Sequence, residues 1–430
     1  MKITFVNHAG FIIESSGIKM ICDPWIEGRS FDNGWELLVA SEFSYDDFSA
    51  ISHIWFSHEH PDHFSPPNIL KINEEYRKNI TVLFQETTDK KVINWCIKNG
   101  FKNVIELSSG VNYTIVEGFE VICSKVFDDS WLFVKSEGKT LLNINDCLIR
   151  SKEDAQEIFD LIKSHINILF TQFSYAQYEG NIDEPQKRRT AAKRKIEHIE
   201  HQISILNPEF IVPFASFVYF CHQENSYMND EINKVSLIYN HFNNSLFTSK
   251  PVVLFPGDLW DLDKQFDSTS SIIRYDEAYD KLLSKRFIES KQVEESKLTQ
   301  AGNALKLKIR EQFGFRFSIY MLKPLRVLIT DINKTGILTP YGGLKILEDS
   351  QLIEHDIKIS SEVLLFCLKF NWGMNTTHVN GRVFMCGING FRQYAKYETI
   401  MNAMNHEHNY KGYREKIASK IQHLFKLKYL

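Results

Sequence analysis

The feature that most constrains this chain is a run of polar residues directly after an apolar segment. Residues 58–63 read His-Glu-His-Pro-Asp-His, and residues 51–57 before them read Ile-Ser-His-Ile-Trp-Phe-Ser. The apolar segment is typical of a buried β-strand. Pro61 has no N–H and disfavours helix at the residue before it. We therefore expect the polar run in a loop at the end of the strand, and not on one face of a helix.

The density of imidazole and carboxylate groups in this run indicates a metal site. In a turn, the side chains of His58, His60, Asp62 and His63 can converge on one point, and His together with Asp suits zinc or iron. The alternative is a polar surface turn that is rich in His by chance. Because ligand-type residues this dense are rare by accident, we predict a metal centre.

The spacing His-x-His-x-Asp-His resembles the signature of the metallo-β-lactamase superfamily. The resemblance implies an α/β fold, an αββα sandwich in which two β-sheets pack face to face between helices. It implies that His58 and His60 hold one metal, that Asp62 and His63 hold a second, and that a later Asp bridges both. Asp62 is then also a candidate catalytic residue, able to hold or relay a proton.

Composition limits the class of protein. The chain has 430 residues, of which 43% are hydrophobic and 24% are charged, as in ordinary globular proteins with two or three domains. A net charge of −4 argues against general nucleic-acid binding. The cysteines form no Cys-x-x-Cys pair and we find no signal peptide, so we expect a reducing, cytoplasmic location. No apolar run reaches the roughly 18 residues of a membrane span.

The order of predicted elements agrees with such a fold. Alternating apolar residues predict an opening β-meander, and Asp23-Pro24-Trp25 follows it. Residues 68–100 predict a helix, a strand and a helix. Further strands and helices follow up to residue 265, where we place the end of a metallo-β-lactamase-like catalytic domain, residues 1–265. The predicted strands are residues 3–6, 11–14, 18–22, 80–84, 119–134, 139–144, 166–170 and 210–215, with helices at residues 151–163 and through Ala192 to Leu206.

Asp146 is our candidate for the bridging carboxylate. It comes just past the strand predicted at residues 139–144. The alternative is a turn or N-cap Asp before the next helix. His8, in the meander, suits a role beside the ligands or in packing, and we leave it outside the ligand set because one His carries little information.

The sequence departs from the superfamily pattern at the third ligand of the first metal. Most members supply a His there, but residues 64–164 contain none. The candidates at the right distance are Asp128 and Asp129, and we favour Asp129. Two His and one carboxylate form a ligand set associated with non-haem iron more than with hydrolytic zinc.

The last ligand of the second metal is also displaced. In phosphodiesterase-like members of the superfamily a His stands where this chain has Ala215. His222 is the nearest replacement, and we prefer it to His198 and His201, which fall in a long helix. The same helix carries a basic face, which is either a solvated surface or a phosphate-binding face: Lys187, Arg188, Arg189, Lys193 and Arg194.

Several short blocks together resemble the CMP-N-acetylneuraminate hydroxylase family and its bacterial relatives. That family hydroxylates the N-acetyl group of a nucleotide sugar and carries a Rieske domain. The Rieske patterns Cys-x-His and Cys-x-x-His are absent from this sequence. We therefore expect an external ferredoxin or reductase, or a chemistry other than oxygenation. The blocks are residues 22–25, 57–63, 143–147, 207–222 and 256–263.

Residues 266–430 are predicted to form a C-terminal α+β domain that acts as a lid, encloses substrate or dimerises. It starts with a Ser-rich linker and helical sequence to about residue 313. The predicted strands are residues 315–322, 326–331, 344–347 and 355–359, and the predicted helices are residues 362–368 and a basic one from about Lys411.

These observations favour an enzyme with two divalent metal ions, iron before zinc. The first hypothesis is an oxygenase that hydroxylates an N-acylated nucleotide sugar or a similar small polar metabolite. The alternative is a hydrolase of a phosphodiester, lactone or amide that uses metal-activated water. A non-enzymatic protein with a vestigial site is a third reading. The predicted ligands are His58, His60 and Asp129 for one metal, Asp62, His63 and His222 for the other, and Asp146, also a catalytic candidate, between them.

Overall fold

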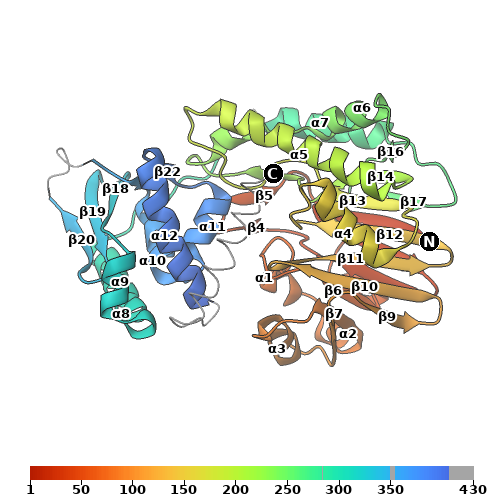
Figure 1. Cartoon of the computed structure of the whole chain (residues 1–430), viewed down its shortest axis with the longest axis horizontal. Coiled ribbons are helices and arrows are strands. Elements are labelled where there is room, and N and C mark those ends of the chain that lie inside the picture. The colour runs from red at the N-terminus through yellow and green to blue at the C-terminus, as the bar shows by residue number, and fades with distance from the viewer. Residues whose placement is uncertain (283, 349–353, 406–430) are drawn as a thin grey trace.

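The computed structural model describes residues 1–282, 284–348 and 354–405, and its centre is a pair of seven-stranded β-sheets (Figure 1). In the first sheet the N-terminal strands are antiparallel, and the strands from β3 onward run parallel. The predicted meander is confirmed. The strand order is β17 (Leu259–Asp261), β1 (Lys2–Asn7), β2 (Gly10–Ser15), β3 (Ile18–Cys22), β6 (His53–Phe56), β7 (Thr81–Gln85) and β8 (Asn103–Leu107).

The second sheet combines an antiparallel half with a parallel half. Strands β9 to β12 pair antiparallel with their neighbours, and β12, β13, β14 and β16 pair parallel. The order is β16 (Lys250–Pro251), β14 (Phe210–Phe214), β13 (Ile168–Gln172), β12 (Lys139–Asn145), β11 (Asp129–Ser136), β10 (Phe119–Val126) and β9 (Val111–Val116).

The main core lies between the two sheets. Phe11 of β2 stacks on Phe170 of β13 with ring centroids 4.1 Å apart. Phe214 of β14 meets both rings edge-on. Such aromatic pairs each contribute about 0.5–1.5 kcal/mol beyond their burial, so the contact fixes the two sheets against each other.

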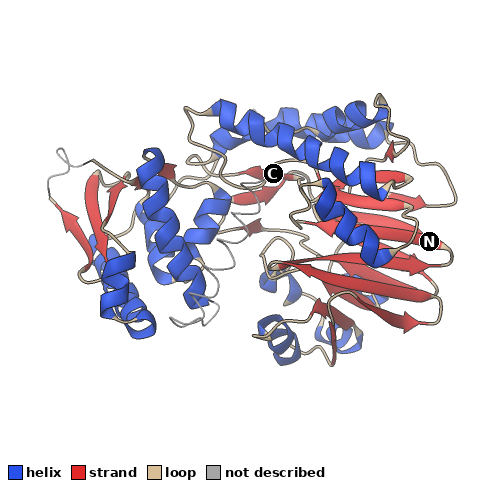
Figure 2. Cartoon of the chain, viewed as in Figure 1, coloured by secondary structure: helices blue, strands red, loops and turns tan. Residues whose placement is uncertain are grey.

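Helices cover the outer face of each sheet, which gives the predicted αββα order (Figure 2). Ile69, Val92 and Cys96 pack on the first sheet, and Ile158 and Ile199 pack on the second. The helices on the first sheet are α1 (Pro66–Ile69), α2 (Glu74–Asn79) and α3 (Lys91–Lys98). Those on the second are α4 (Lys152–Ile162), α5 (Pro185–Leu206), α6 (Val235–Asn243) and α7 (Thr269–Leu282).

A small sheet connects the sandwich to the C-terminal unit. It contains β15 (Val218–Phe220), β5 (Trp35–Leu37) and β4 (Arg29–Ser30). Two short 3-10 helices, η1 (Asp46–Ala50) and η2 (Ser226–Asn229), belong to the same connecting regions. At the junction Asn380 donates to the carbonyl of Phe31, and a Cβ on Gly34 would lie only 2.3 Å from the Asn380 Cβ. Gly34 therefore permits a close approach.

The C-terminal unit is an α+β arrangement, at the left of Figure 1. The predicted strand at residues 315–322 is wrong, because residues 315–321 form helix α9, and its buried Ser318 lies one turn before the buried Leu322 that caps the helix. The alternating aromatic residues before Ser318 mimicked a strand. The sheet is β20 (Gly343–Leu347), β19 (Lys334–Thr339), β18 (Leu325–Ile329), β21 (Ile357–Ile359) and β22 (Phe384–Met385). Its helices are α8 (Glu295–Phe313), α9 (Phe315–Met321), α10 (Ser361–Lys369), α11 (Gly373–Asn380) and α12 (Gly387–Asn405).

The domain division at residue 265 stays a prediction. Helix α7 follows that position, and its Tyr275 stacks on Phe217 with ring centroids 4.1 Å apart, within the core of the sandwich. The helix predicted from about Lys411 lies outside the described residues. Across residues 1–282, 284–348 and 354–405, no helix combines the length and the apolar character that a bilayer crossing requires.

Candidate metal centre

The candidate site forms where strand ends of both sheets meet. The turn between β1 and β2 carries His8, and residues 58–63 follow β6. From the second sheet, Asp129 begins β11 and Asp146 follows β12. The ends of parallel strands bring residues far apart in sequence to one edge. The predicted loop at the end of a strand is thus confirmed, and its neighbours His8, Asp129 and Asp146 come from three separate segments.

Backbone strain is concentrated at these strand ends. His8 has φ 44°, Asp23 has φ 40°, and Asn145 has φ 55°, all in the left-handed region. Non-glycine residues adopt this region at a cost of about 1–3 kcal/mol, and such strain gathers at functional sites. The strained turns direct His8, Asp23 and Asp146 toward one another.

The first donor group contains His58, His60 and Asp129. His58 Nε2 lies 2.8 Å from His60 Nδ1 and 3.6 Å from Asp129 Oδ1. The three donor atoms lie within 4.8 Å of one another. Asp128 is exposed in the hairpin turn before β11, so the structure brings Asp129 and not Asp128 to this group.

The second donor group contains His8, Asp62 and His63. Asp62 Oδ2 lies 3.2 Å from His8 Nε2 and 3.3 Å from His63 Nε2. All three side chains are buried, with exposed fractions of 1%, 2% and 0%. Asp62 and His63 are predicted ligands, and His8 is the partner that the sequence analysis left outside the set.

Asp146 stands between the two groups. Its Oδ2 lies 3.4 Å from His63 Nε2, and its donor atoms group with those of both His58 and His63. Its other oxygen, Oδ1, accepts from Gln172 Nε2 at 3.1 Å. Asp146 is thus the carboxylate that lies next to a histidine of each donor group.

Asp23 orients the ligands from behind. Its Oδ2 lies 3.0 Å from His63 Nδ1 and accepts from Ser57 Oγ at 2.7 Å and Asn145 Nδ2 at 2.7 Å. Because a carboxylate only accepts, the proton at this contact sits on His63 Nδ1, and Nε2 faces Asp62 and Asp146. Such carboxylate–histidine contacts fix the ring and tautomer of metal ligands.

The electrostatics of the site favour an added cation. Burial opposes charge on His63, but Asp62, Asp146 and Asp23 around it hold its pKa well above the usual value. Burial raises the pKa of Asp129 to about 7. Burial also acts to raise the pKa of Asp146, yet His63 beside it lowers that pKa to about 2. Without a metal, a proton on His63 is therefore the positive charge that compensates the carboxylates.

Atoms without partners test the fit to metal ions. Among the described residues, His63 Nε2 and Asp62 Oδ1 are buried and lack a hydrogen-bond partner. Buried polar atoms are normally satisfied, so such exceptions require an explanation. Nitrogen and oxygen donors of this kind suit zinc and iron. The residues therefore fit a pair of metal ions, because His63 Nε2 and Asp62 Oδ1 belong to side chains of the donor groups.

His222 does not join the cluster. After Ala215 the chain enters β15 of the small sheet, which carries His222 to the junction with the C-terminal unit. There its ring is buried, and burial together with Arg382 lowers its pKa to about 4. Among the described residues it belongs to no group of possible metal donors, and His8 occupies the place predicted for it.

Sequence reasoning missed His8, Asp23 and Lys195. A signal for the first two existed in the strand pairing: Asn7 pairs with Gly10, and Cys22 pairs with Trp55. The β1–β2 turn and the end of β3 therefore lie at the same edge as the loop after β6. Lys195 falls next to the basic residues noted on its helix, but only the packing shows that it faces the site.

A cavity of about 390 Å³ opens beside the donor groups. His60, Asp129 and Asp146 line one part of it, so a ligand in the cavity would contact the metal centre. Cavities of this size accept small molecules. The apolar part of the lining is Phe31, Trp35, Tyr175 and Val379, the last from α11 of the C-terminal unit.

Comparison with known proteins agrees with this architecture. Residues 2–140 match the beta-lactamase superfamily domain, so the superfamily resemblance and the fold predicted from residues 58–63 are confirmed. This match covers the loop at residues 58–63 and Asp129.

The curated relatives and solved structures are distant. A putative Rieske 2Fe-2S iron–sulfur protein of Mycolicibacterium smegmatis is 24% identical over 252 residues, which are 54% of this chain and 46% of the relative. The cytidine monophosphate-N-acetylneuraminic acid hydroxylase of Xenopus laevis is 25% identical over 267 residues, 58% of this chain and 45% of the relative. The chain thus spans about half the length of these relatives. CmlA, a diiron β-hydroxylase from Streptomyces venezuelae, has 15% identity and a TM-score of 0.40, over 59% of this chain and 53% of CmlA.

Proposed function

We propose, from the premise that residues 2–140 form a beta-lactamase superfamily domain, that this chain is an iron-dependent oxygenase. Its substrate is a small polar metabolite, and an N-acylated nucleotide sugar is the class we favour. The hydroxylase among its relatives acts, by its name, on such a compound. The proposal concerns the centre built by His58, His60 and Asp129 and the groups beside it.

One observation carries this proposal: a carboxylate replaces the third imidazole of the first donor group. Asp129 Oδ1 faces His58 Nε2 at 3.6 Å, and His60 completes the group. Two imidazoles and one carboxylate are the ligand set of many non-haem iron oxygenases. We therefore place iron before zinc.

The proposed ligand assignment covers two ions. His58, His60 and Asp129 hold the first ion. His8, Asp62 and His63 hold the second, and His8 takes the role first predicted for His222. Asp146 bridges the ions, because its donor atoms group with ligands of both.

The residues around the metal centre position the substrate and determine which groups carry protons. A pair of irons, when bound, supplies the activation of O₂ that hydroxylation requires. Burial acts to raise the pKa of Asp62, but His63 and His8 beside it hold that pKa well below its usual range, so Asp62 stays ionised, with its Oδ2 3.2 Å from His8 Nε2. Gln172 fixes Asp146 through its amide. The aromatic wall of Phe31, Trp35 and Tyr175 excludes water from the substrate.

Hydroxylation by O₂ also needs electrons. One oxygen atom enters the substrate C–H bond and the other leaves as water, which consumes a pair of electrons and a pair of protons. No Rieske ligand pattern occurs in this sequence. We propose an external ferredoxin or reductase as the donor, in keeping with the Rieske-named relatives.

The test compares turnover by iron-loaded and zinc-loaded protein. The full chain is loaded without air with either metal, reduced chemically, and mixed with CMP-N-acetylneuraminate and O₂. Mass spectrometry should find a product with one added oxygen only for the iron form. Asp129→Asn should remove this activity and iron at one site, whereas the matched variant Asp128→Asn should keep both, since Asp128 is exposed.

Two outcomes would contradict the proposal. One is hydrolysis of a phosphodiester or lactone by the zinc form, with no oxygen transfer by the iron form to any N-acylated nucleotide sugar. The other is equal behaviour of Asp129→Asn and Asp128→Asn.

A further inference from the structure

We propose that the cavity beside the metal centre binds an anionic group of the substrate, a phosphoryl or carboxylate group, through Arg150, Arg194 and Lys195. We call these three residues the basic cradle. This inference rests on the proposed function in so far as the cavity is the substrate site. Arg150 lies in the segment between β12 and α4, and Arg194 and Lys195 lie on α5.

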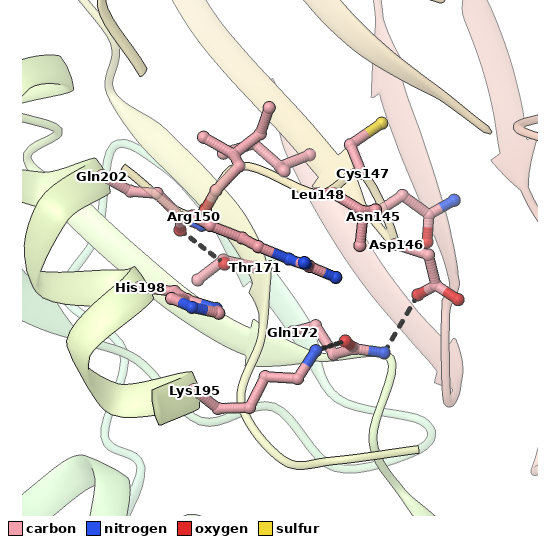
Figure 3. A pocket seen from close by; sticks show the side chains of 12 residues that line it. Asn145, Asp146, Cys147, Leu148, Arg150, Thr171, Gln172, Lys195, His198 and Gln202 are labelled. Carbon is pink, nitrogen blue, oxygen red and sulfur yellow. Dashed lines mark hydrogen bonds between the residues drawn. The ribbon is translucent and has the colours of Figure 1, made fainter. Parts of the chain in front are cut away.

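The basic cradle and the metal centre line one cavity. His60, Asp129 and Asp146 belong to the same lining as Arg150 and Lys195. Figure 3 shows the Arg150 guanidinium, the Gln172 amide and the Lys195 amine in the space beside Asp146. A ligand held by the basic cradle would therefore reach the metal centre with its other end.

The basic face of α5 divides into paired and available cations. Arg188 is buried and pairs with Asp230 at 2.7 Å, and it is structural. The exposed cations on the far side of the helix also pair with carboxylates. These pairs are Lys187–Glu184 at 2.6 Å, Arg189–Glu231 at 2.8 Å and Lys193–Glu197 at 3.6 Å.

The basic cradle differs from these cations in its ion pairs. Across the ion pairs of residues 1–282, 284–348 and 354–405, the side chains of Arg150 and Lys195 have no carboxylate partner. Lys195 Nζ donates to the neutral amide oxygen of Gln172. Arg194 pairs with Glu179 at 3.3 Å, an exposed and therefore weak contact. Arg150 and Lys195 thus reach the cavity without an ion-pair partner, and the carboxylates that act on them from a longer distance are Glu179, Asp146 and Asp154.

Few negative charges lie near the basic cradle. Glu179 already faces Arg194, and Asp146 is committed to the metal centre. Burial, followed by Lys195 and Arg150, lowers the pKa of His198 to about 4, so its imidazole is neutral at pH 7. Burial also lowers the pKa of Lys195 to about 8, although Asp146 acts in the opposite direction. Apart from the carboxylates of the metal centre, the lining therefore holds three cations, Arg150, Arg194 and Lys195, and one carboxylate, Glu179.

The chemistry of the three side chains defines the ligand class. A guanidinium binds two oxygens of a phosphate or carboxylate at once, and an ammonium adds a point charge. Phosphoryl and carboxylate groups both meet this geometry. The cavity of about 390 Å³ is of the size that accepts a small molecule.

The test is calorimetric titration of the metal-loaded full chain with three probes. Inorganic phosphate and cytidine 5′-monophosphate carry phosphoryl groups, and N-acetylneuraminate carries a carboxylate. We expect at least one class to bind. Arg150→Gln and Lys195→Gln should each weaken binding roughly tenfold, and the double variant roughly a hundredfold, because each loses a charge-assisted hydrogen bond.

The matched controls are Lys193→Gln and Arg189→Gln on the same helix, whose side chains pair away from the cavity. They should leave affinity within about twofold of wild type. Metal content and melting temperature, measured for every variant, exclude loss of folding. Binding of only the phosphates, or only the sugar acid, identifies which anion the basic cradle holds.

The proposal is overturned if no probe binds to the wild type, or if the double variant binds as tightly as the wild type. The latter result would place the anion on the metal ions. The experiment separates the two proposals. If the variants weaken binding but no oxygen transfer occurs, the oxygenase is refuted and the anion site is kept. If oxygen transfer occurs but the variants do not change binding, the anion site is refuted and the oxygenase is kept.

Discussion

The metal centre and the cluster around Arg382 both bury carboxylates, but only the Arg382 cluster contains its own permanent cation. Arg382 is 1% exposed and pairs with Glu224 at 2.9 Å, Glu362 at 3.2 Å and Asp32 at 3.3 Å. In the metal centre, the ion-pair partners of Asp62, Asp129 and Asp146 among the described residues are all imidazoles.

This difference between the two clusters distinguishes a group of charges that stabilises the fold from one that binds a ligand. A buried carboxylate group is costly unless it is paired. The Arg382 cluster sets one permanent cation among three carboxylates, and it connects Asp32, in the turn between β4 and β5, with Glu362 in the C-terminal unit. The metal centre leaves buried donor atoms such as His63 Nε2 without hydrogen-bond partners, and without a bound ion a proton on His63 is the charge that compensates its carboxylates.

The largest expected effect follows from His58→Ala in the metal centre. It removes a ligand shared by the first donor group and the group with Asp146. We expect a folded protein that lacks one metal ion, with turnover lowered roughly a thousandfold, since bound metals contribute several kcal/mol to catalysis. His165→Ala, at an exposed His paired with Glu209, is the control. Full metal content in His58→Ala would refute the ligand assignment.

The Arg382 cluster should respond in the opposite way. Arg382→Gln leaves the partly exposed carboxylates of Asp32, Glu224 and Glu362 without their common partner, so the free energy of unfolding should fall by about 1–3 kcal/mol. Denaturant titration measures it, and metal content per folded chain should not change. Arg189→Gln, at a surface pair, should show no measurable loss. If Arg382→Gln were as stable as the wild type, the claim that the Arg382 cluster stabilises the fold would be wrong.

Variants of His8 and His222 test the comparison of the two clusters further, because His8 is a buried His in the metal centre and His222 is a buried His beside Arg382. His8→Asn should weaken binding of the second metal roughly 10–100-fold. His222→Asn should leave metal affinity unchanged, since its ring lies near Arg382. Metal titration of both variants decides between them, and the reverse pattern would return His222 to the ligand set.

The smallest effect concerns pH. Burial, with Arg150 and Arg194 facing it, lowers the pKa of Lys195 to about 8, while Asp146 and Glu179 raise it. Lys195 is charged below that pH and neutral above it, so affinity for N-acetylneuraminate or phosphate should fall roughly tenfold between pH 7 and 9. Lys195→Gln should lack this step. A step of equal size in that variant would assign it to another group.

Much of the fold was predictable because its signals are local. The loop at residues 58–63 and Asp146 each follow an apolar strand, and a strand places the residue after it at the sheet edge. Asp129 is predicted as a candidate ligand, but the turn between β10 and β11 that positions it is not, because residues 119–134 read as one strand. The strand predicted at residues 315–322 failed because alternating aromatic residues carry no information on which face is buried.

The rest of the site depends on long-range packing. His8 becomes a candidate ligand because β1, β2, β3 and β6 lie side by side, and His222 is excluded because β15 leaves the edge of the sandwich. Lys195 differs from Lys193 only in the face of α5 on which it lies. Such distinctions arise from sheet order and helix orientation, which a single sequence does not encode locally.

The most direct measurement is the metal content of the full chain, purified without air from medium that contains both iron and zinc. Optical spectra before and after O₂ accompany it. We predict about two irons per chain and a spectral change that requires O₂, because the metal centre lacks its own cation and contains the Asp129 carboxylate. No stoichiometric metal would contradict the account of the buried donors. Tightly held zinc with inert spectra would contradict the oxygenase.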